Sequence, residues 1–183
     1  MDDLSNQSLE EFLDSVGENT PAPGGGTSSA ITVALAAALV EMAARIGEDP
    51  DESDESAESD GPADQAAELR ADALRLAEQE LTSYGPVLKA ATPADRTTAL
   101  DGASEPPAQI AETAANVAEL GVRVAGSASP AVRGDALTGV ILAEAAAAAA
   151  ARLVSTNITS GPVFDRARAA AERASKARES GTV

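Results

Sequence analysis

Hydrophobic positions recur along the chain with the spacing of helices, and no stretch shows the two-residue alternation of a strand. The longest helical segment, residues 27–46, is apolar on almost every side, so we expect it at the centre of the fold or of an oligomer. Shorter apolar stripes with a period near 3.6 run through residues 8–16, 62–91, 107–126, 135–155 and 163–178. The pattern predicts an all-α, single-domain, antiparallel bundle of about five to six helices across residues 1–183.

A segment rich in glycine and proline comes directly before the apolar helix. Residues 20–29 read Thr-Pro-Ala-Pro-Gly-Gly-Gly-Thr-Ser-Ser. Proline fixes its own φ and consecutive glycines are costly to order, so this segment cannot be regular structure. A turn without side chains at a helix N-terminus leaves backbone N–H groups open to an anion or a polar ligand. The alternative is that the glycines only allow a neighbouring helix to come close, with Thr27 or Ser28 as an ordinary cap.

Residues 48–61 are dominated by Asp and Glu and contain no apolar side chain larger than alanine. Such a segment cannot bury anything, so we expect a solvated, flexible acidic loop. A cation site in this loop is the alternative.

Composition removes several kinds of chemistry. The chain has no Cys, which excludes disulfides and thiolate metal sites, and no His, the commonest general base and metal ligand. Catalysis therefore has to use carboxylates, Tyr, Lys, hydroxyl groups or the backbone, and we expect no metal and no bound cofactor. The net charge of −17 opposes binding to nucleic acid and to anionic membranes. Together with only two lysines, this charge resembles adaptation to concentrated salt.

The first residues, Met1-Asp2-Asp3, lack the features of a signal peptide. The longest apolar runs, 30–40 and 145–151, are too short to span a bilayer. Glu41 follows the first run and Glu144 precedes the second. We therefore expect a cytoplasmic protein without a membrane partner.

Two single carboxylates, Glu41 and Glu144, stand within otherwise apolar helices. Burying a charge is costly, so each is either paired with an arginine, such as Arg45 or Arg152, or directed into a wet cavity.

Glu80, Tyr84 and Lys89 lie near Pro86, where we expect a kink in the helix. Glu80 and Tyr84 are one turn apart and can share a face, which Lys89 joins only if the kink turns it there. Tyr84 is alternatively a core residue. Asp135 follows Gly134 at the predicted start of a helix, where it is an N-cap, a catalytic carboxylate, or both.

The order of these features resembles the cyclodeaminase/cyclohydrolase family of one-carbon folate metabolism. The resemblance begins with Ser-Leu-Glu-Glu-Phe-Leu at 8–13, Pro-Ala-Pro-Gly-Gly-Gly-Thr at 21–27 and the end of the Ala-rich helix at 37–45. It continues with an acidic residue four positions before an aromatic one (Glu80 and Tyr84) and Val87 three positions after it. It returns at Gly134-Asp135 and 142–146 and ends at Asn157, so it covers about residues 8–160.

The chain departs from the family's pattern in three places, and one of them is a shortened stretch between Lys89 and Pro107. Where relatives often carry Gly followed by lysines, this chain has Gly47-Glu48-Asp49-Pro50, so a cationic seat for the glutamate tail of folate is missing there. Relatives have an Asn-Val-x-x-Asn motif near the end of the chain. Here Leu153 stands at the position of its first Asn, and Asn157 corresponds to its second Asn.

The resemblance implies an all-helical dimeric enzyme that acts on a one-carbon derivative of tetrahydrofolate. A homodimer is also expected because helix 27–46 is too apolar for the surface of a monomer. Family members hydrolyse 5,10-methenyltetrahydrofolate to the 10-formyl form, or cyclise 5-formiminotetrahydrofolate with loss of ammonia, usually beside a formiminotransferase domain. Because this chain stands alone, we expect the methenyltetrahydrofolate cyclohydrolase. The alternatives are a formiminotetrahydrofolate cyclodeaminase and a non-catalytic folate-binding or oligomeric helical protein.

Hydrolysis of the cationic methenyl bridge needs a water molecule directed at its carbon and a proton for the departing ring nitrogen. A nearby carboxylate stabilises the cation and serves as base. Asp135 is the first candidate for this carboxylate. Tyr84 and Lys89 are candidates for protonating the nitrogen, and Glu80, one turn before Tyr84, is also expected among the catalytic residues. Tyr84 can also stack on the pterin. The residues expected to bind the substrate are Pro23, Gly24, Gly25, Gly26, Thr27, Glu41, Glu144 and Asn157.

Overall fold

The computed structural model describes residues 4, 7–47 and 61–181 of the 183-residue chain. Within these residues the chain forms seven helices and no strand: α1 (Leu9–Gly17), α2 (Gly25–Gly47), α3 (Pro62–Ser83), α4 (Gly85–Lys89), α5 (Pro93–Ser127), α6 (Pro130–Asn157) and α7 (Pro162–Gly181). The prediction of an all-helical bundle is confirmed. All of the predicted acidic loop except Gly61 lies outside the described residues.

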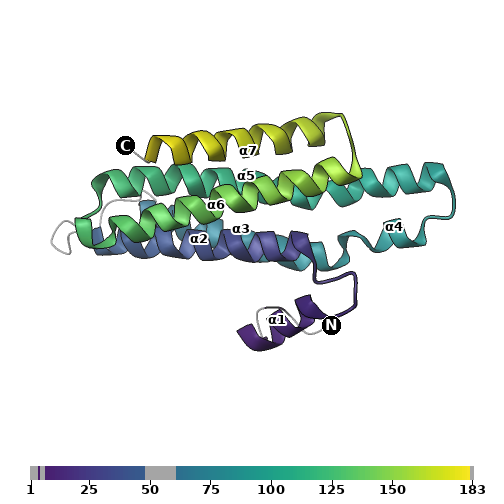
Figure 1. The fold of residues 1–183 in the computed structure, drawn as a ribbon, viewed down its shortest axis with the longest axis horizontal. Helices are drawn as coiled ribbons and strands as arrows, with labels where there is room; N and C mark the ends of the chain where they lie inside the picture. The colour runs from purple at the N-terminus through teal and green to yellow at the C-terminus, as the bar shows by residue number, and fades with distance from the viewer. Residues whose placement is uncertain (1–3, 5–6, 48–60, 182–183) are drawn as a thin grey trace.

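The long helices form three layers (Figure 1). α2 and α3 pack side by side, α5 and α6 lie over them, and α7 covers α5 and α6 from the opposite side. α1 projects from the bundle beside the N-terminal end of α2. α2 therefore lies in the core on one side and faces away from the bundle on the other.

Alanine and valine fill most of the core, as in a bundle whose helices come very close together. The largest fully buried side chains are Leu76 and Ile110, and there is no buried aromatic ring among the described residues. Two glycines mark the closest crossings. A Cβ atom at Gly121 would lie 2.8 Å from Val140 Cγ2, and one at Gly139 would lie 2.9 Å from the carbonyl oxygen of Ala36. Larger residues at these two positions would push α2, α5 and α6 apart.

By length and composition alone, α2 and α6 are apolar enough to cross a membrane, whereas the sequence analysis expected their uninterrupted apolar runs to be too short for that. The inner sides of both helices are packed in the bundle, with 50% of the apolar window of α2 and 39% of that of α6 buried. This burial is what core helices of a bundle show. Twelve residues of α2 are buried, so the expectation that residues 27–46 occupy the centre of the fold is met on the inner side of the helix only.

Three helix boundaries differ from the prediction. α5 begins at Pro93 rather than Pro107, because Thr92 and Asp95 form a capping box there, with Asp95 N donating to Thr92 Oγ1 at 3.1 Å. Pro106 and Pro107 consequently lie inside the helix. α6 begins at Pro130, so Asp135 does not open it. The predicted third helix is divided at Tyr84, and this division adds the short helix α4 to the expected five or six.

Arginines of α7 attach that helix to α5. Arg166 forms a bidentate pair with Glu112, with both N–O distances 2.8 Å, and also contacts Glu105 at 3.0 Å. Seven residues later, Arg173 pairs with Glu119 at 2.7 Å. Arg166 and Arg173 are therefore engaged in ion pairs between neighbouring helices.

Candidate functional site

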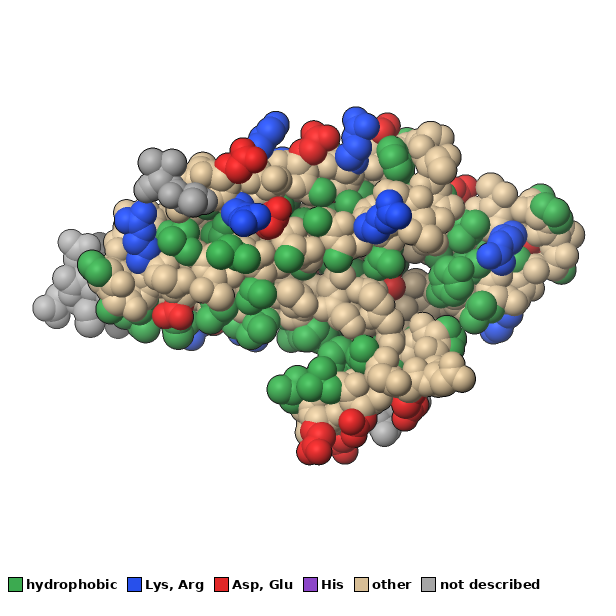
Figure 2. Space-filling view, in the orientation of Figure 1, with side chains coloured by type: hydrophobic (Ala, Val, Ile, Leu, Met, Phe, Trp, Pro, Cys, Tyr) green, Lys and Arg blue, Asp and Glu red, His purple; other side chains and the backbone are tan. Residues whose placement is uncertain are grey.

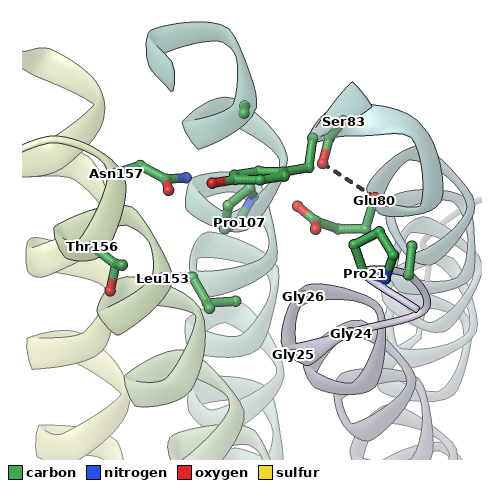
Figure 3. Close-up of a pocket in the computed structure, with 13 residues that line it drawn as sticks. Pro21, Gly24, Gly25, Gly26, Glu80, Ser83, Pro107, Leu153, Thr156 and Asn157 are labelled. Atoms are coloured by element: carbon green, nitrogen blue, oxygen red, sulfur yellow. Dashed lines mark hydrogen bonds between the residues drawn. The ribbon is translucent and has the colours of Figure 1, made fainter. Parts of the chain in front are cut away.

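A cavity of about 240 Å³ lies at the end of the bundle where α2 begins (Figure 3). Its walls come from the loop before α2, the C-terminal end of α3, the middle of α5 and the C-terminal end of α6. The lining residues are Pro21, Ala22, Gly24, Gly25, Gly26, Glu80, Ser83, Tyr84, Ala103, Pro107, Leu153, Thr156 and Asn157. Segments that are distant in the sequence thus meet around one small space.

The glycine segment forms the floor of this cavity and the first turn of α2. Ser28 N donates a hydrogen bond of 3.0 Å to the carbonyl oxygen of Gly24, which makes this the first helical bond of α2. The amides of Gly25, Gly26 and Thr27 precede it and have no acceptor within the helix. Gly25 and Gly26 line the cavity, so the predicted open amides do lie beside a space that a ligand can enter.

The carboxyl group of Glu80 lies directly against Gly26. A Cβ atom at Gly26 would be 2.9 Å from Glu80 Cγ and nearer still to its carboxyl atoms. Any residue other than glycine at position 26 would therefore displace this side chain. The glycine segment therefore both lines a cavity and allows α3 to come close, and this approach places an acidic group in the cavity. The predicted cap at Thr27 or Ser28 is wrong, because both residues lie inside α2.

The environment of Glu80 changes its acidity. Its Oε1 atom is buried and has no hydrogen-bond partner among the described residues. Burial raises the pKa of the Glu80 carboxyl from the ordinary 4.5 to about 7, and the nearby Ser83 hydroxyl opposes this rise. A carboxyl group with a pKa near neutrality can both accept and donate a proton at the pH of a cell. Glu80 is therefore the residue of this cavity best suited to proton transfer.

Two neighbours of Glu80 complete the α3 wall. The Ser83 hydroxyl donates a hydrogen bond of 3.1 Å to the backbone carbonyl of Glu80 (Figure 3). Tyr84 lines the cavity and is 38% exposed, so it is not a core residue. Helix α3 ends at Ser83 because Pro86, in the following turn, has no N–H to continue the helical hydrogen bonds. The predicted kink near Pro86 is thus a break between α3 and α4.

The α5 wall contains an unusual backbone feature. Ala103 and Pro107 both line the cavity, and they are separated by one helical turn. Pro107 has no N–H, so it cannot donate to the carbonyl oxygen of Ala103 as a residue at that position of a helix normally does. The carbonyl oxygen of Ala103, a residue that lines the cavity, therefore lacks the donor that a helix normally provides.

The end of α6 supplies the wall opposite Glu80. Asn157 and Glu80 extend into the cavity from opposite sides (Figure 3). Leu153 lies near Gly25, where an added Cβ atom would be 3.6 Å from Leu153 Cδ2. This leucine, which replaces the first Asn of the family motif, makes that part of the wall apolar. No lysine or arginine of the described chain lines the cavity.

Two of the predicted catalytic residues do not reach this cavity. Asp135 lies inside α6, 22 positions before Asn157, which corresponds to about 33 Å along the helix axis. Its predicted role as N-cap is wrong, because Ser129 occupies that position. Lys89 ends α4, is exposed and is not among the residues that line the cavity.

Four of the predicted substrate-binding residues also lie elsewhere. Glu41 is buried but paired, with Arg45 at 2.7 Å and Arg70 at 2.9 Å. Glu144 pairs with Arg178 of α7 at 3.3 Å rather than with Arg152. Thr27 is buried in the first turn of α2. Pro23 lines a separate cavity of about 230 Å³ on the other side of the loop. The ion-pair alternative for the two glutamates is the one that the structure supports.

Several lining residues were not found from the sequence. Ser83, Thr156 and Leu153 are ordinary helix residues whose position depends on where α3 and α6 end. Pro107 carried a recognisable signal, since two adjacent prolines inside a helix remove two backbone donors. No group of three or more acidic side chains in the described part of the chain is placed to hold a metal ion.

Comparison with known proteins agrees with this description. Residues 8–176 match the family model described as formiminotransferase-cyclodeaminase. This match covers most of the chain, so the protein belongs to the formiminotransferase-cyclodeaminase family. The search of curated proteins gave no match.

A solved structure shares the fold. Formiminotetrahydrofolate cyclodeaminase from Thermotoga maritima superposes with a TM-score of 0.80 over 97% of this chain and 92% of that chain, at 23% sequence identity. At this level of identity the likeness concerns the fold, so the two chains share the arrangement of their helices.

Proposed function

We propose that this protein is a formiminotetrahydrofolate cyclodeaminase, which closes 5-formiminotetrahydrofolate to 5,10-methenyltetrahydrofolate and releases ammonia. The family match supports the reaction class, and the name of the solved relative supports the substrate. The observation that carries the proposal is the Glu80 carboxyl group, buried against Gly26 in a cavity with a pKa raised to about 7. This proposal differs from the cyclohydrolase expected from the sequence.

The reaction moves one proton between two nitrogens of the substrate. N10 attacks the formimino carbon, which gives a tetrahedral intermediate that carries the new N10–C bond and an amino group. Glu80 as carboxylate takes the proton from N10, and Glu80 as carboxylic acid gives it to the amino group. The C–N bond to that amino group then breaks and ammonia leaves. A group with a pKa near 7 suits both halves of this transfer, because neither proton-transfer state is strongly disfavoured.

The other walls suit a pterin ring. The open amides at the start of α2 are donors for a ring carbonyl, and the Ala103 carbonyl and Asn157 side chain provide acceptors for ring N–H groups. Tyr84 offers an aromatic face next to Glu80. Glu80 as carboxylate also faces the positive charge of the formimino group and lowers the energy of the cation. The cavity contains no basic residue, so we place the glutamate tail of the substrate outside it.

Hydrolysis of 5,10-methenyltetrahydrofolate is the second candidate. Glu80 lines the cavity, so a water molecule bound in the cavity could lose its proton to the carboxylate. Attack of this water on the methenyl carbon gives an adduct in which that carbon carries a hydroxyl group. Glu80 returns the proton to N5, the C–N5 bond breaks, and the hydroxyl group loses its own proton to solvent, which gives the 10-formyl product. The two candidates therefore share the same proton-transfer group and differ in the nucleophile.

The test is incubation of the purified protein with each folate in concentrated salt. With 5-formiminotetrahydrofolate the proposal predicts that ammonia release and methenyl absorbance rise together, at equal molar amounts. Loss of methenyl absorbance above the uncatalysed rate, without ammonia release from the formimino substrate, would assign the hydrolase instead. Folate binding without either reaction would indicate a non-catalytic folate-binding protein.

A further inference from the structure

The second cavity, which contains Pro23, lies between α1 and the C-terminal end of α3. Its volume of about 230 Å³ is close to the 240 Å³ of the cavity that contains Glu80. Ala22 lines both cavities, so the loop before α2 is the wall between them. The proposed reaction makes no use of this second space.

The cavity exists because α1 is held beside the bundle without packing closely on it. α1 contains no buried residue and projects from the bundle, as Figures 1 and 2 show. The segment before α1 is nevertheless attached to α3, since Leu4 N donates a hydrogen bond of 2.8 Å to Glu78 Oε1. The N-terminal segment, α1 and α3 therefore enclose a space that no side chain fills.

The polar part of the lining offers hydrogen-bond acceptors and a negative charge. The Ser15 hydroxyl donates its proton to the carbonyl oxygen of Phe12 at 2.7 Å, and the Thr20 hydroxyl donates to that of Ala22 at 3.0 Å. Both hydroxyl oxygens keep lone pairs that can accept a hydrogen bond. Glu18 adds a carboxylate, and no lysine or arginine of the described chain lines the cavity.

Gln7 adds an acceptor that lacks a donor. This residue lines the cavity, and its Oε1 atom is buried without a hydrogen-bond partner among the described residues. Buried amide oxygens are normally hydrogen-bonded, because an unpaired one has lost its contact with water. A donor bound in the cavity would supply the missing partner once the Gln7 amide turns its oxygen toward it.

The rest of the lining is apolar and comes from Leu4, Pro23 and Leu81. An inorganic cation would use the acceptors but would leave this apolar wall in contact with water. A short alkyl chain would cover it, and this burial is favourable. The volume is several times that of one water molecule, about 30 Å³ in the liquid, so the cavity has room for both parts of such a ligand.

We propose that this cavity binds a small organic ammonium ion that carries a short alkyl chain. The N–H groups of the ligand donate to the Gln7 amide oxygen and the Glu18 carboxylate, and the Ser15 and Thr20 hydroxyl oxygens are further acceptors. The alkyl chain lies against Leu81. Charge and acceptors select an ammonium group over a neutral or anionic one, and the apolar wall selects an alkylammonium over the free ammonium ion.

Isothermal titration calorimetry at constant ionic strength tests this selectivity with three probes. Butylammonium chloride should bind saturably at one site per chain and at least about tenfold more tightly than ammonium chloride. Butanol, which has the same alkyl chain without the charge, should give no saturable heat. Ammonium chloride that binds as tightly as butylammonium would assign the cavity to an inorganic cation and overturn the proposal, as would the absence of saturable binding of butylammonium.

Two pairs of variants locate the binding. Gln7→Leu and Glu18→Gln should each weaken butylammonium binding about tenfold, since each removes a hydrogen bond to a charged group. The matched controls are Gln79→Leu and Glu10→Gln, which are exposed and lie outside the cavity, and they should stay within about twofold of the parent. Equal affinities for the members of a pair would place the bound ligand elsewhere and overturn the proposal.

Methyl NMR of the parent chain gives a readout that does not depend on the folding of any variant. Butylammonium should shift the methyl signals of Leu81, which lines the cavity, and leave those of the exposed Leu88 of α4 unchanged. A saturable shift at Leu88 without one at Leu81 would contradict the assignment. Heat and chemical shift report binding directly, so the proposal stands or falls separately from the proposed enzymatic activity.

Discussion

The carboxyl group of Glu80 lies against the Cα atom of Gly26, so that a single added methyl group at position 26 would occupy the same space. Glu80 comes from the last turn of α3 and Gly26 from the first turn of α2. The contact explains why a glycine is needed at this point of the Gly24–Gly26 segment. The contact also explains the raised pKa of Glu80, because the close packing that buries the carboxyl group removes it from water.

Replacing Gly26 by alanine should displace Glu80 without unfolding the protein, because the atoms in the way belong to the far end of a flexible side chain. The displaced carboxyl would be more solvated, and its pKa would fall back toward 4.5. We expect kcat/KM for the folate substrate to fall about tenfold or more, with the acidic limb of its pH profile moved to lower pH. Gly126→Ala, where an added Cβ atom meets nothing within 4 Å, is the matched control. A Gly26→Ala enzyme with an unchanged pH profile would contradict this relationship.

The same burial predicts how Glu80 affects stability. Its pKa is raised in the folded protein, so the folded state holds a proton that the unfolded state loses above pH 4.5. Stability therefore falls as the pH rises from 4.5 to about 7, and the penalty stays constant above that. Glu80→Gln should raise the free energy of unfolding at pH 8.5 by about 1–2 kcal/mol, after allowance for partial solvent screening. At pH 4 it should change little.

Urea unfolding at the two pH values measures this difference. Glu68→Gln, an exposed residue of the same helix, is the control and should leave the stability unchanged within about 0.5 kcal/mol. Equal effects of Glu80→Gln at pH 4 and pH 8.5 would show that the carboxyl is not ionised at a cost in the folded state.

The two adjacent prolines of α5 give a matched pair of substitutions. Pro107→Ala restores an N–H that can donate to the carbonyl of Ala103 in the cavity wall, whereas Pro106→Ala restores one for Gly102, outside the cavity. If the Ala103 carbonyl binds the substrate, Pro107→Ala should raise KM about five- to tenfold, consistent with loss of one hydrogen bond of about 1 kcal/mol or more. Pro106→Ala should leave KM within about twofold of the parent. Equal KM values for the two variants would show that the Ala103 carbonyl does not contribute to substrate binding.

Much of the fold follows from local signals in the sequence. The Ser8–Glu11 capping box, the apolar segment of α2 and the break near Pro86 are all visible as residue patterns, and the structure contains each of them. The start of α5 was missed because two prolines at 106 and 107 are typical of a helix start, whereas the Thr92–Asp95 capping box had already begun the helix. Local propensity cannot decide between two valid starts when packing stabilises the longer helix.

The site was predictable only in part. Gly24–Gly26, Glu80, Tyr84 and Asn157 were selected from the sequence, and all of them line one cavity. Asp135 was selected with the same kind of evidence and lies at the other end of α6. The sequence does not show which end of a helix lies at the cavity. Asp135 is near the start of α6, whereas the cavity is lined by the end of that helix. Glu41 and Glu144 show the same limit, since their arginine partners Arg70 and Arg178 come from other helices.

The account depends most on Glu80 as the group that transfers the proton. The direct test is the pH dependence of ammonia release from 5-formiminotetrahydrofolate by the parent enzyme and by Glu80→Gln. We expect kcat/KM of the parent to rise with a midpoint near the pKa of about 7. Glu80→Gln should be slower by about 10²–10⁴-fold and should lose this midpoint, with folate binding retained. A Glu80→Gln enzyme that releases ammonia at the parental rate, with the same pH profile, would contradict the account.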